Sequence, residues 1–370
     1  MYRSMVKKAV GAFLVIAAAI NLSACSMQKE KVRYSKAYLE FFDTVTQIVG
    51  YEEDEETFSQ NCEKVYSLFE EYHQLTDIYH SYEGVNNVRT INRSAGIEPV
   101  KVDEKLIDLL EFSKEMYTVT NGKCNIAMGS VLSIWHKYRE KGIDDPESAE
   151  LPPVEDLVSA SEHCSIDDLI IDRAAGTVYL SDPEMSLDLG AAAKGYAVER
   201  AAELLASEGV TSGYSLNVGG NVRTIGTKND GSDWAAGIQN PDTESEQPYI
   251  VRLKLNGMAL VTSGNYQRYY EVDGVRYHHI IDPDTLMPLN YFDSVTILCN
   301  DSGKADALST ALFNMTIPDG KALLENLEGV DAIWVLPDGS YDCTEGFEAD
   351  NRLTFKQWKC QNCLENFHVK

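Results

Sequence analysis

Residues 251–262, VRLKLNGMALVT, decide the fold class of this chain. Apolar and charged residues alternate over residues 251–255, Asn256-Gly257 follows, and a second apolar run covers residues 258–262. Such alternation is typical of a strand with one buried face, and Asn-Gly is the strongest short signal for a hairpin turn. The stretch therefore predicts two antiparallel strands joined in a hairpin.

Similar patterns extend this prediction along the chain. Residues 169–171 and 177–180 flank a turn at Ala175-Gly176, which predicts a second hairpin. Apolar residues spaced three or four apart predict three helices. One covers about 106–116 and ends near Asn121-Gly122, one covers about 193–207 and ends near Gly209, and one covers about 303–315 and is ended by Pro318. Strands in hairpins with helices between them favour an α+β fold, mainly antiparallel sheets with packed helices, over a doubly wound parallel sheet.

The first residues have the pattern of a lipoprotein signal. Arg3, Lys7 and Lys8 precede an apolar run over residues 9–20, and Leu-Ser-Ala-Cys ends at Cys25. Because a bilayer span needs about 20 residues, we expect cleavage before Cys25 and a lipid on its thiol, with an uncleaved anchor as the alternative. The protein is then expected at the cell membrane, lipid-anchored and facing the extracytoplasmic side.

The chain is strongly acidic. Its formal charge is −26, and removal of residues 1–24 takes away three positive charges and leaves −29. Such a charge repels nucleic acid and argues against it as a partner. It does not exclude an anionic dinucleotide, because a bound metal can reverse the field locally.

The chain divides into four predicted parts. Residues 1–24 are the signal peptide, residues 25–35 the lipidated Cys25 with a polar tether, residues 36–346 one domain, and residues 347–370 a tail of uncertain role.

The cysteines do not indicate a disulfide framework. Seven remain beside Cys25, an odd number with irregular spacing, so we expect Cys124 and Cys299 to be buried thiols. Cys360 and Cys363 have the spacing of a redox or zinc half-site, but only two ligands are visible, so we expect a local disulfide or free thiols instead.

Three segments together predict a nucleotide and divalent-metal site. DLGAAAKGY, residues 188–196, places a carboxylate, small residues and a lysine where a helix begins, so that backbone groups can approach a phosphate. HHIIDP, residues 278–283, supplies imidazoles. In ADALST, residues 305–310, Asp306 and Thr310 share a helix face and both offer oxygen to a hard cation. By spacing alone, a favourable helix dipole for Asp306 and a backbone hydrogen bond for Thr310 explain these residues better than a metal does.

The order of these segments resembles the ApbE family of flavin transferases. Further short matches occur at residues 92–96, 128–132, 217–222 and 262–266, and the resemblance covers most of the chain before fading near Gly346. It implies an α+β, T-fold-like body with a smaller lobe. It also implies transfer of FMN from FAD to a threonine hydroxyl of an exported acceptor protein, with release of AMP.

The resemblance also implies roles for particular residues. Asp306, Thr310 and the backbone carbonyl of Ala191 would bind Mg2+, and His279 would lie beside the diphosphate as a candidate base. Successive strand residues point to opposite faces, so His278 is expected to be exposed or structural. Asp282 is expected either to orient His279 or to form the turn at Pro283. The matched FAD contacts are Phe42, Tyr82, Asn125 with its neighbours to Ala127, Asp188, Lys194 and Ile280.

Some positions depart from the family pattern. Many members have Asp and Thr where this chain has Asn125 and Ala127, and a glycine in place of Leu286. The same residues would also serve a Mg2+-dependent FAD pyrophosphatase that gives FMN and AMP, or a non-catalytic flavin-binding lipoprotein. The sequence alone does not separate these functions.

Overall fold

The computed structural model describes residues 30–242 and 245–350. The predicted signal peptide, Cys25, Cys360 and Cys363 lie outside these residues. Across the described part of the chain, no helix has both the length and the apolar content that a bilayer crossing requires.

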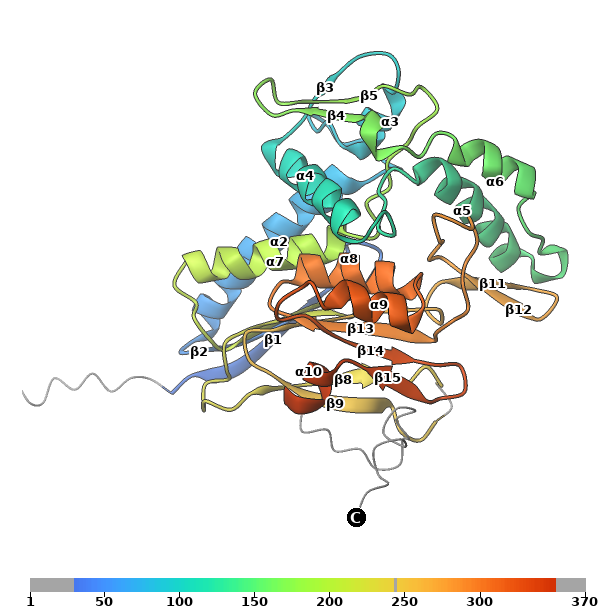
Figure 1. Ribbon diagram of the computed structural model, residues 1–370. Helices are drawn as coiled ribbons and strands as arrows, with labels where there is room; N and C mark the ends of the chain where they lie inside the picture. Colours follow the sequence, from blue (N-terminus) through green and yellow to red (C-terminus); the bar gives the residue numbers. More distant parts are fainter. Residues whose placement is uncertain (1–29, 243–244, 351–370) are drawn as a thin grey trace, which may run out of the picture.

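One eight-stranded antiparallel sheet organises the molecule (Figure 1). Its strand order is β1-β2-β6-β7-β10-β13-β14-β15, and every neighbouring pair is antiparallel. The strands are β1 (Val32–Tyr38), β2 (Thr46–Glu52), β6 (Tyr214–Val218), β7 (Asn221–Ile225), β10 (Ala259–Gly264), β13 (Ser294–Cys299), β14 (Asp331–Val335) and β15 (Tyr341–Cys343). The α+β class predicted from the sequence is confirmed.

Alternate residues of the central strands enter two different cores. Val261, Ile297 and Trp334 pack toward the helices, whereas Leu260 and Leu298 pack toward a two-stranded ribbon on the other face. Helices α2 (Glu55–Thr76), α7 (Ala193–Ser207), α8 (Ser302–Phe313) and α9 (Ile317–Leu324) form the helical layer, and β8 (Trp234–Gln239) with β9 (Tyr249–Leu255) form the ribbon. The sheet is therefore buried on both faces.

The hairpin predicted over residues 251–262 is wrong, although both of its strands exist. β9 pairs with β8, and β10 pairs with β7 and β13. Gly257 has φ +64 and forms a turn there, but the chain uses this turn to pass from the ribbon to the main sheet. Both sides of β10 are taken by main-sheet strands, while Val251, Leu253 and Leu255 pack against Trp234 and Ile238 in the outer core.

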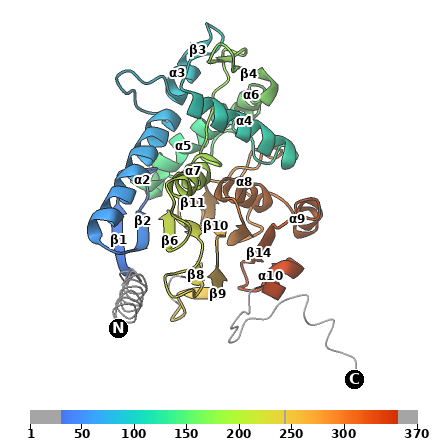
Figure 2. The same ribbon diagram turned by 90° about the vertical axis from the view of Figure 1, so that its left-hand side faces the viewer.

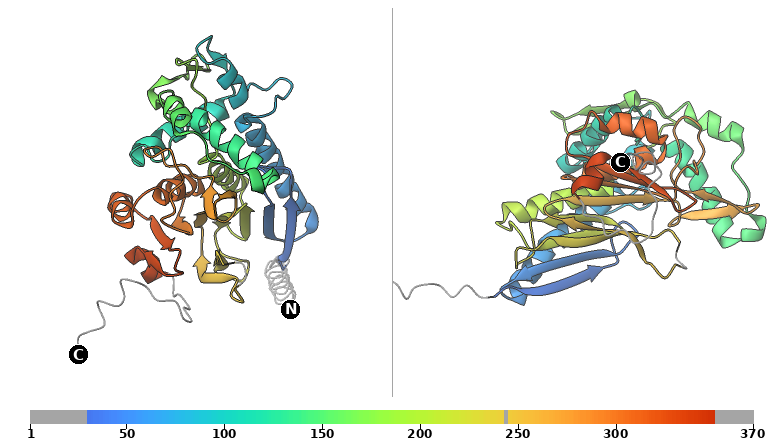
Figure 3. Two further views of the ribbon diagram at one scale, coloured as in Figure 1. Left: turned by 90° about the vertical axis from the view of Figure 1, so that its right-hand side faces the viewer. Right: turned by 60° about the horizontal axis from the view of Figure 1, so that its bottom comes forward.

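The second predicted hairpin is confirmed in a smaller part of the molecule. β4 (Leu169–Asp172) pairs with β5 (Thr177–Leu180), and Gly176 adopts the left-handed φ of +69 in their turn. This part also holds β3 (Val100–Lys101), the 3-10 turns Pro146–Ser148 and Ile166–Asp168, α3 (Val88–Arg93), α4 (Glu104–Val119), α5 (Gly129–Asp144), α6 (Val154–Ser161), and the ribbon of β11 (Tyr269–Val272) and β12 (Val275–His278). Figures 2 and 3 show β3–β5 and α10 (Glu345–Asp350) at opposite ends of the molecule.

One predicted helix end is wrong, and two elements cross the predicted domain boundaries. α7 spans residues 193–207 as expected, but Pro318 lies in the first turn of α9, where its missing N–H costs nothing, instead of ending α8. β1 begins at Val32, inside the predicted tether of residues 25–35. α10 crosses the predicted boundary at 346, and Phe347 is fully buried.

The expectation for the cysteines holds within the described residues. Cys124 and Cys299 are buried free thiols, and Cys62 and Cys164 are free thiols as well.

Candidate functional site

The site begins where the first turn of α7 meets α8. The Gly195 N–H donates to Asp306 Oδ2 over 2.8 Å. A Cβ at Gly195 would lie 2.3 Å from the Ser302 carbonyl oxygen and 2.4 Å from the Asp306 Cβ. Only glycine permits this approach, so the small residues of the 188–196 segment serve helix contact as well as backbone access.

Asp306 is the carboxylate of this junction. It is 4% exposed, and its Oδ2 lies 3.7 Å from the Lys194 ammonium, which also donates to the Gly190 carbonyl over 3.4 Å. Thr310 lies one turn further along α8 and is half-buried, while Ala191 lies two residues before the start of α7. The structure therefore brings Lys194 and Asp306 together and places the other two predicted metal ligands on the same two segments.

This donor set fits magnesium. No group of three or more His, Cys, Asp or Glu side chains suited to a metal occurs in the part of the chain that the structure describes. Magnesium commonly takes one or two carboxylates and completes its shell with neutral oxygens, waters and substrate phosphates. One buried carboxylate with a hydroxyl on the same helix face matches that preference better than it matches zinc.

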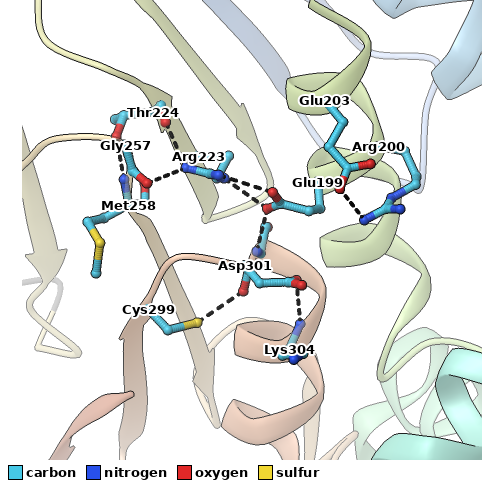
Figure 4. A network of polar contacts seen from close by, with 11 residues as sticks. Glu199, Arg200, Glu203, Arg223, Thr224, Gly257, Met258, Cys299, Asp301 and Lys304 are labelled. Carbon is cyan, nitrogen blue, oxygen red and sulfur yellow. Dashed lines mark hydrogen bonds and ion pairs between the residues drawn. The ribbon is translucent and has the colours of Figure 1, made fainter. Parts of the chain in front are cut away.

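A buried ionic network fixes α7 and α8 to the sheet (Figure 4). Arg223 on β7 donates to both Glu199 oxygens, over 2.8 and 3.0 Å, and Glu199 on α7 also accepts the Ser302 N–H over 2.7 Å. Arg223 donates in addition to the Gly257 carbonyl over 2.6 Å. These bonds tie three elements together one to two helical turns from Gly195 and Asp306.

His279 follows β12 and has an unsatisfied buried nitrogen. Its Nδ1 has no hydrogen-bond partner among the described residues. Burial, followed by repulsion from Arg268, Arg139, His278 and Lys194, lowers the pKa of His279 to about 3. The imidazole is therefore neutral at physiological pH, and Lys194 lies within electrostatic reach of it.

His278 is expected to be either exposed or structural, and the structure shows a structural role. It is 1% exposed, its Nδ1 accepts the Ile280 N–H over 3.2 Å, and its Nε2 contacts the Leu289 carbonyl over 3.0 Å. These bonds place its proton on Nε2, and burial lowers its pKa to about 4.

Asp282 is a turn-forming residue that also makes an ion pair. One oxygen accepts the Thr285 N–H over 3.0 Å, and the other lies 2.5 Å from the Lys123 ammonium. Both oxygens are thus engaged by groups other than His279, which favours the turn interpretation.

The predicted FAD contacts Phe42 and Tyr82 belong to separate loops, and Asp43 beside Phe42 acts electrostatically on Tyr82. Phe42 and Asp43 both have φ +53, and the Phe42 N–H donates to His73 Nδ1 over 3.3 Å. The charge of Asp43 helps to raise the pKa of Tyr82 to about 12, after burial and the hydrogen bond that Tyr82 donates to Asp77.

Asn125 and Asp188 are joined through the backbone. The Asp188 N–H donates to the Ile126 carbonyl over 2.9 Å, and Asp188 Oδ1 accepts the Gly190 N–H over 2.8 Å, which fixes its loop. The Asn125 side chain bonds to the Cys164 carbonyl and the Ala127 N–H, so its amide is already engaged in the fold. Ile280 is buried in the helical-layer core.

Sequence reasoning missed two arginines. Arg139 on α5 and Arg268 just before β11 act electrostatically on His279 and on each other. Arg139 lies in a charged helical stretch that resembles any solvated surface, and Arg268 only adjoins the 262–266 segment.

Comparison with known proteins then decides the family. The family model described as the ApbE family matches residues 42–334. An FAD:protein FMN transferase of Klebsiella pneumoniae is 34% identical over 74% of this chain and 81% of its own length, and one of Treponema pallidum is 34% identical over 67% and 70%. The chain belongs to the ApbE family.

Solved ApbE structures share this fold. The ApbE protein of Thermotoga maritima superposes with a TM-score of 0.75 at 28% identity, covering 87% of this chain and all of that one. The flavin transferase ApbE of Vibrio cholerae gives a TM-score of 0.69 at 26% identity, covering 85% and 96%. The ApbE architecture thus accounts for nearly all of the described residues.

One departure from the ApbE pattern now has a structural explanation. Leu286 has φ +60, a left-handed conformation that glycine adopts without strain. Two hydrogen bonds hold the Leu286 backbone in this conformation. The Leu286 N–H donates to the Asp282 carbonyl over 2.8 Å, and the Leu286 carbonyl accepts the Trp135 Nε1–H over 2.9 Å. The glycine preferred at this position in the family suits this turn.

Proposed function

We propose that this chain is a Mg2+-dependent FAD:protein FMN transferase that attaches FMN to a threonine hydroxyl of an exported acceptor protein and releases AMP. The flavin-transferase class rests on membership of the ApbE family and on relatives that carry this activity in their names. The observation that carries the proposal in this molecule is the α7–α8 junction, which brings the Lys194 ammonium to 3.7 Å from Asp306 Oδ2 and within electrostatic reach of His279.

The reaction exchanges one phosphorus–oxygen bond for another. The threonine oxygen bonds to the phosphorus on the flavin side of FAD, and the bond from that phosphorus to the bridging oxygen breaks. AMP leaves with the bridging oxygen and its electron pair, while the hydroxyl proton passes to a base. No oxidant or reductant is needed.

Each group of the site has a task in this scheme. Bound magnesium would neutralise charge on the diphosphate, held by Asp306, Thr310 and the Ala191 carbonyl. Lys194 binds a phosphate oxygen, and Asp188 fixes the loop that carries the small residues. His279, with its unpaired Nδ1, accepts the hydroxyl proton. The negative charge of the bound diphosphate would offset the cations that lower the pKa of this imidazole in the free protein.

We also propose that the protein works at the membrane surface. Cleavage before Cys25 would leave a lipid anchor and residues 26–31 before β1, with the enzyme facing exported acceptors. The acidic chain makes nucleic acid an unsuitable partner.

The test uses the chain without residues 1–24, mixed with FAD, Mg2+ and an FMN-acceptor domain. Gel fluorescence and intact mass would show a labelled acceptor, and Asp306→Ala or a chelator would remove the label. Glu155→Ala is the matched control, because Glu155 is an exposed carboxylate on α6. FMN and AMP without labelled acceptor would assign a pyrophosphatase, and bound FAD without turnover would assign a flavin-binding protein.

A further inference from the structure

Two arginines from distant elements converge on the site without acidic partners. Arg139 lies on α5, and Arg268 lies between β10 and β11. Arg139 Nη2 lies 2.8 Å from His136 Nδ1, and Arg268 Nη2 donates to the Asp43 carbonyl over 3.3 Å. Within residues 30–242 and 245–350, neither guanidinium has a carboxylate oxygen within 4.0 Å.

The arrangement is electrostatically unfavourable in the free protein. Arg139 is half-buried, and burial followed by repulsion from Arg268 lowers its pKa, even though Tyr79, Glu140 and Asp188 act in the opposite direction. The chain has 58 acidic residues against 32 Lys and Arg. Acidic side chains are abundant in this protein, yet none in the described part of the chain pairs with either arginine. Because this arrangement does not stabilise the fold, we look for a ligand that the two arginines bind.

The same two arginines act electrostatically on His279. Both repel a proton on His279, and Lys194 adds to their effect from α7. His279 Nδ1 is buried without a partner among the described residues. Arg139, Arg268 and Lys194 therefore all lie within electrostatic reach of His279, and the Lys194 ammonium is 3.7 Å from Asp306 Oδ2.

Elementary chemistry selects the ligand for this region. A guanidinium binds phosphate through two parallel N–H bonds, and it does so most strongly when it is not already paired with a carboxylate. Two adjacent phosphates would cancel the mutual repulsion of the arginines. A single phosphate or an uncharged ring system would not provide a separate anionic partner for each of the two arginines.

We propose that Arg139 and Arg268 form a clamp for the two phosphates of the dinucleotide substrate, opposite Lys194 and the predicted magnesium ligands. The clamp rests on the proposed function and deepens it, because it makes the diphosphate the recognised feature of FAD. It gives the enzyme selectivity for dinucleotides over riboflavin and mononucleotides.

The experiment measures ligand binding by Arg139→Gln and Arg268→Gln in the chain without residues 1–24. Flavin fluorescence gives Kd for FAD and riboflavin in the presence of a chelator, so that FAD is not consumed, and inorganic pyrophosphate serves as a competitor. We expect each variant to bind FAD and pyrophosphate about tenfold or more weakly, as for the loss of a charge-assisted hydrogen bond. Riboflavin affinity should change less than about twofold, because riboflavin carries no phosphate for the clamp to bind.

The matched control is Arg173→Gln. Arg173 is an exposed arginine between β4 and β5 that pairs with Asp108 and Glu111 on α4. It should leave both flavin affinities unchanged. Arg139→Lys and Arg268→Lys should recover part of the FAD affinity, because they keep the charge and lose the paired geometry.

Two outcomes would overturn the clamp. One is wild-type affinity for FAD and pyrophosphate in both glutamine variants while the wild-type protein still labels an acceptor, which leaves the proposed function standing. The other is an equal loss of riboflavin and FAD binding with a lowered Tm and no recovery by lysine, which assigns the arginines to folding alone. Weakened pyrophosphate binding in a protein that labels no acceptor would support the clamp and reject the transferase.

Discussion

His279 is half-buried and has a buried, unpaired ring nitrogen, and this combination defines its expected contribution. Replacing it with glutamine keeps a polar side chain but removes the basic nitrogen. We expect His279→Gln to slow labelling of the acceptor about a hundred- to ten-thousandfold, the usual range for loss of a general base. The Kd for FAD should change less than about threefold, since a base contributes to the transition state more than to substrate binding.

Single-turnover labelling and fluorescence titration would separate these two effects. His163→Gln is a suitable control, because His163 pairs with Asp182 over 2.7 Å in the smaller part of the molecule. A large loss of FAD affinity with an unchanged labelling rate would reassign His279 to substrate binding.

The same buried imidazoles make stability depend on pH. The pKa of His278 falls to about 4 and that of His279 to about 3 in the folded protein. Below about pH 6.5, which is the pKa that histidine has in the unfolded chain, these two histidines bind protons in the unfolded protein but stay neutral in the folded protein. Stability is therefore full above pH 6.5 and falls as the pH drops toward 4, by up to about 1.4 kcal/mol per pH unit for each histidine.

Urea unfolding at pH 7, 6 and 5 would measure this slope. His163 acts in the opposite direction, because its partner Asp182 raises its pKa. Comparison of the wild type with His278→Gln isolates the buried group, and the variant should show the shallower slope. Equal slopes would mean that His278 is protonated in the folded protein.

The contact between α7 and α8 has no room for one additional carbon. Gly195→Ala would push the Ser302 carbonyl and Asp306 away from α7. We expect a loss of about 1–3 kcal/mol, as for overpacked cores, together with a loss of acceptor labelling larger than the loss of stability explains. Thermal unfolding and labelling rates would measure both.

Gly231→Ala provides the control for this change. Gly231 has φ +77 but no heavy atom within 4 Å of an added Cβ. It should lower stability through backbone strain and leave labelling intact. If both variants label at the wild-type rate at a temperature where they are folded, the helix contact does not position the site.

The elements show what local sequence can predict. Alternation and spacing located β4, β5, β9, β10, α4 and α7, because these signals depend on near neighbours along the chain. The partners of β9 and β10 did not follow, because pairing depends on which strands cover the two faces of the sheet. Lys194, Asp306 and His279 were recognised from motifs, whereas Arg139 and Arg268 belong to no local pattern and meet only in the folded molecule.

The folded domain includes residues beyond Gly346, where the resemblance to the family motifs ends. Phe347 is fully buried with Trp234, Leu253 and Ile333 in the core between the ribbon and the sheet. We expect truncation after Gly346 to cost about 3–5 kcal/mol, as for deletion of a buried phenylalanine. Urea unfolding of the truncated chain and of the full chain would measure this loss.

Phe347→Ala in the full chain separates the side chain from the truncation itself. It should reproduce most of the loss. If truncation after Gly346 leaves stability unchanged, the boundary predicted from the sequence is adequate after all.

The hydrogen bond from Gly195 to Asp306 joins residues 111 positions apart. The chain between them supplies β6–β13, so these two residues meet only after several non-local strand pairings have formed. Contacts between distant residues are slow to form because the intervening loop must first lose its freedom. Catalytic competence should therefore return with the last phase of refolding, after most secondary structure is in place, and a partly folded chain should have no partial activity.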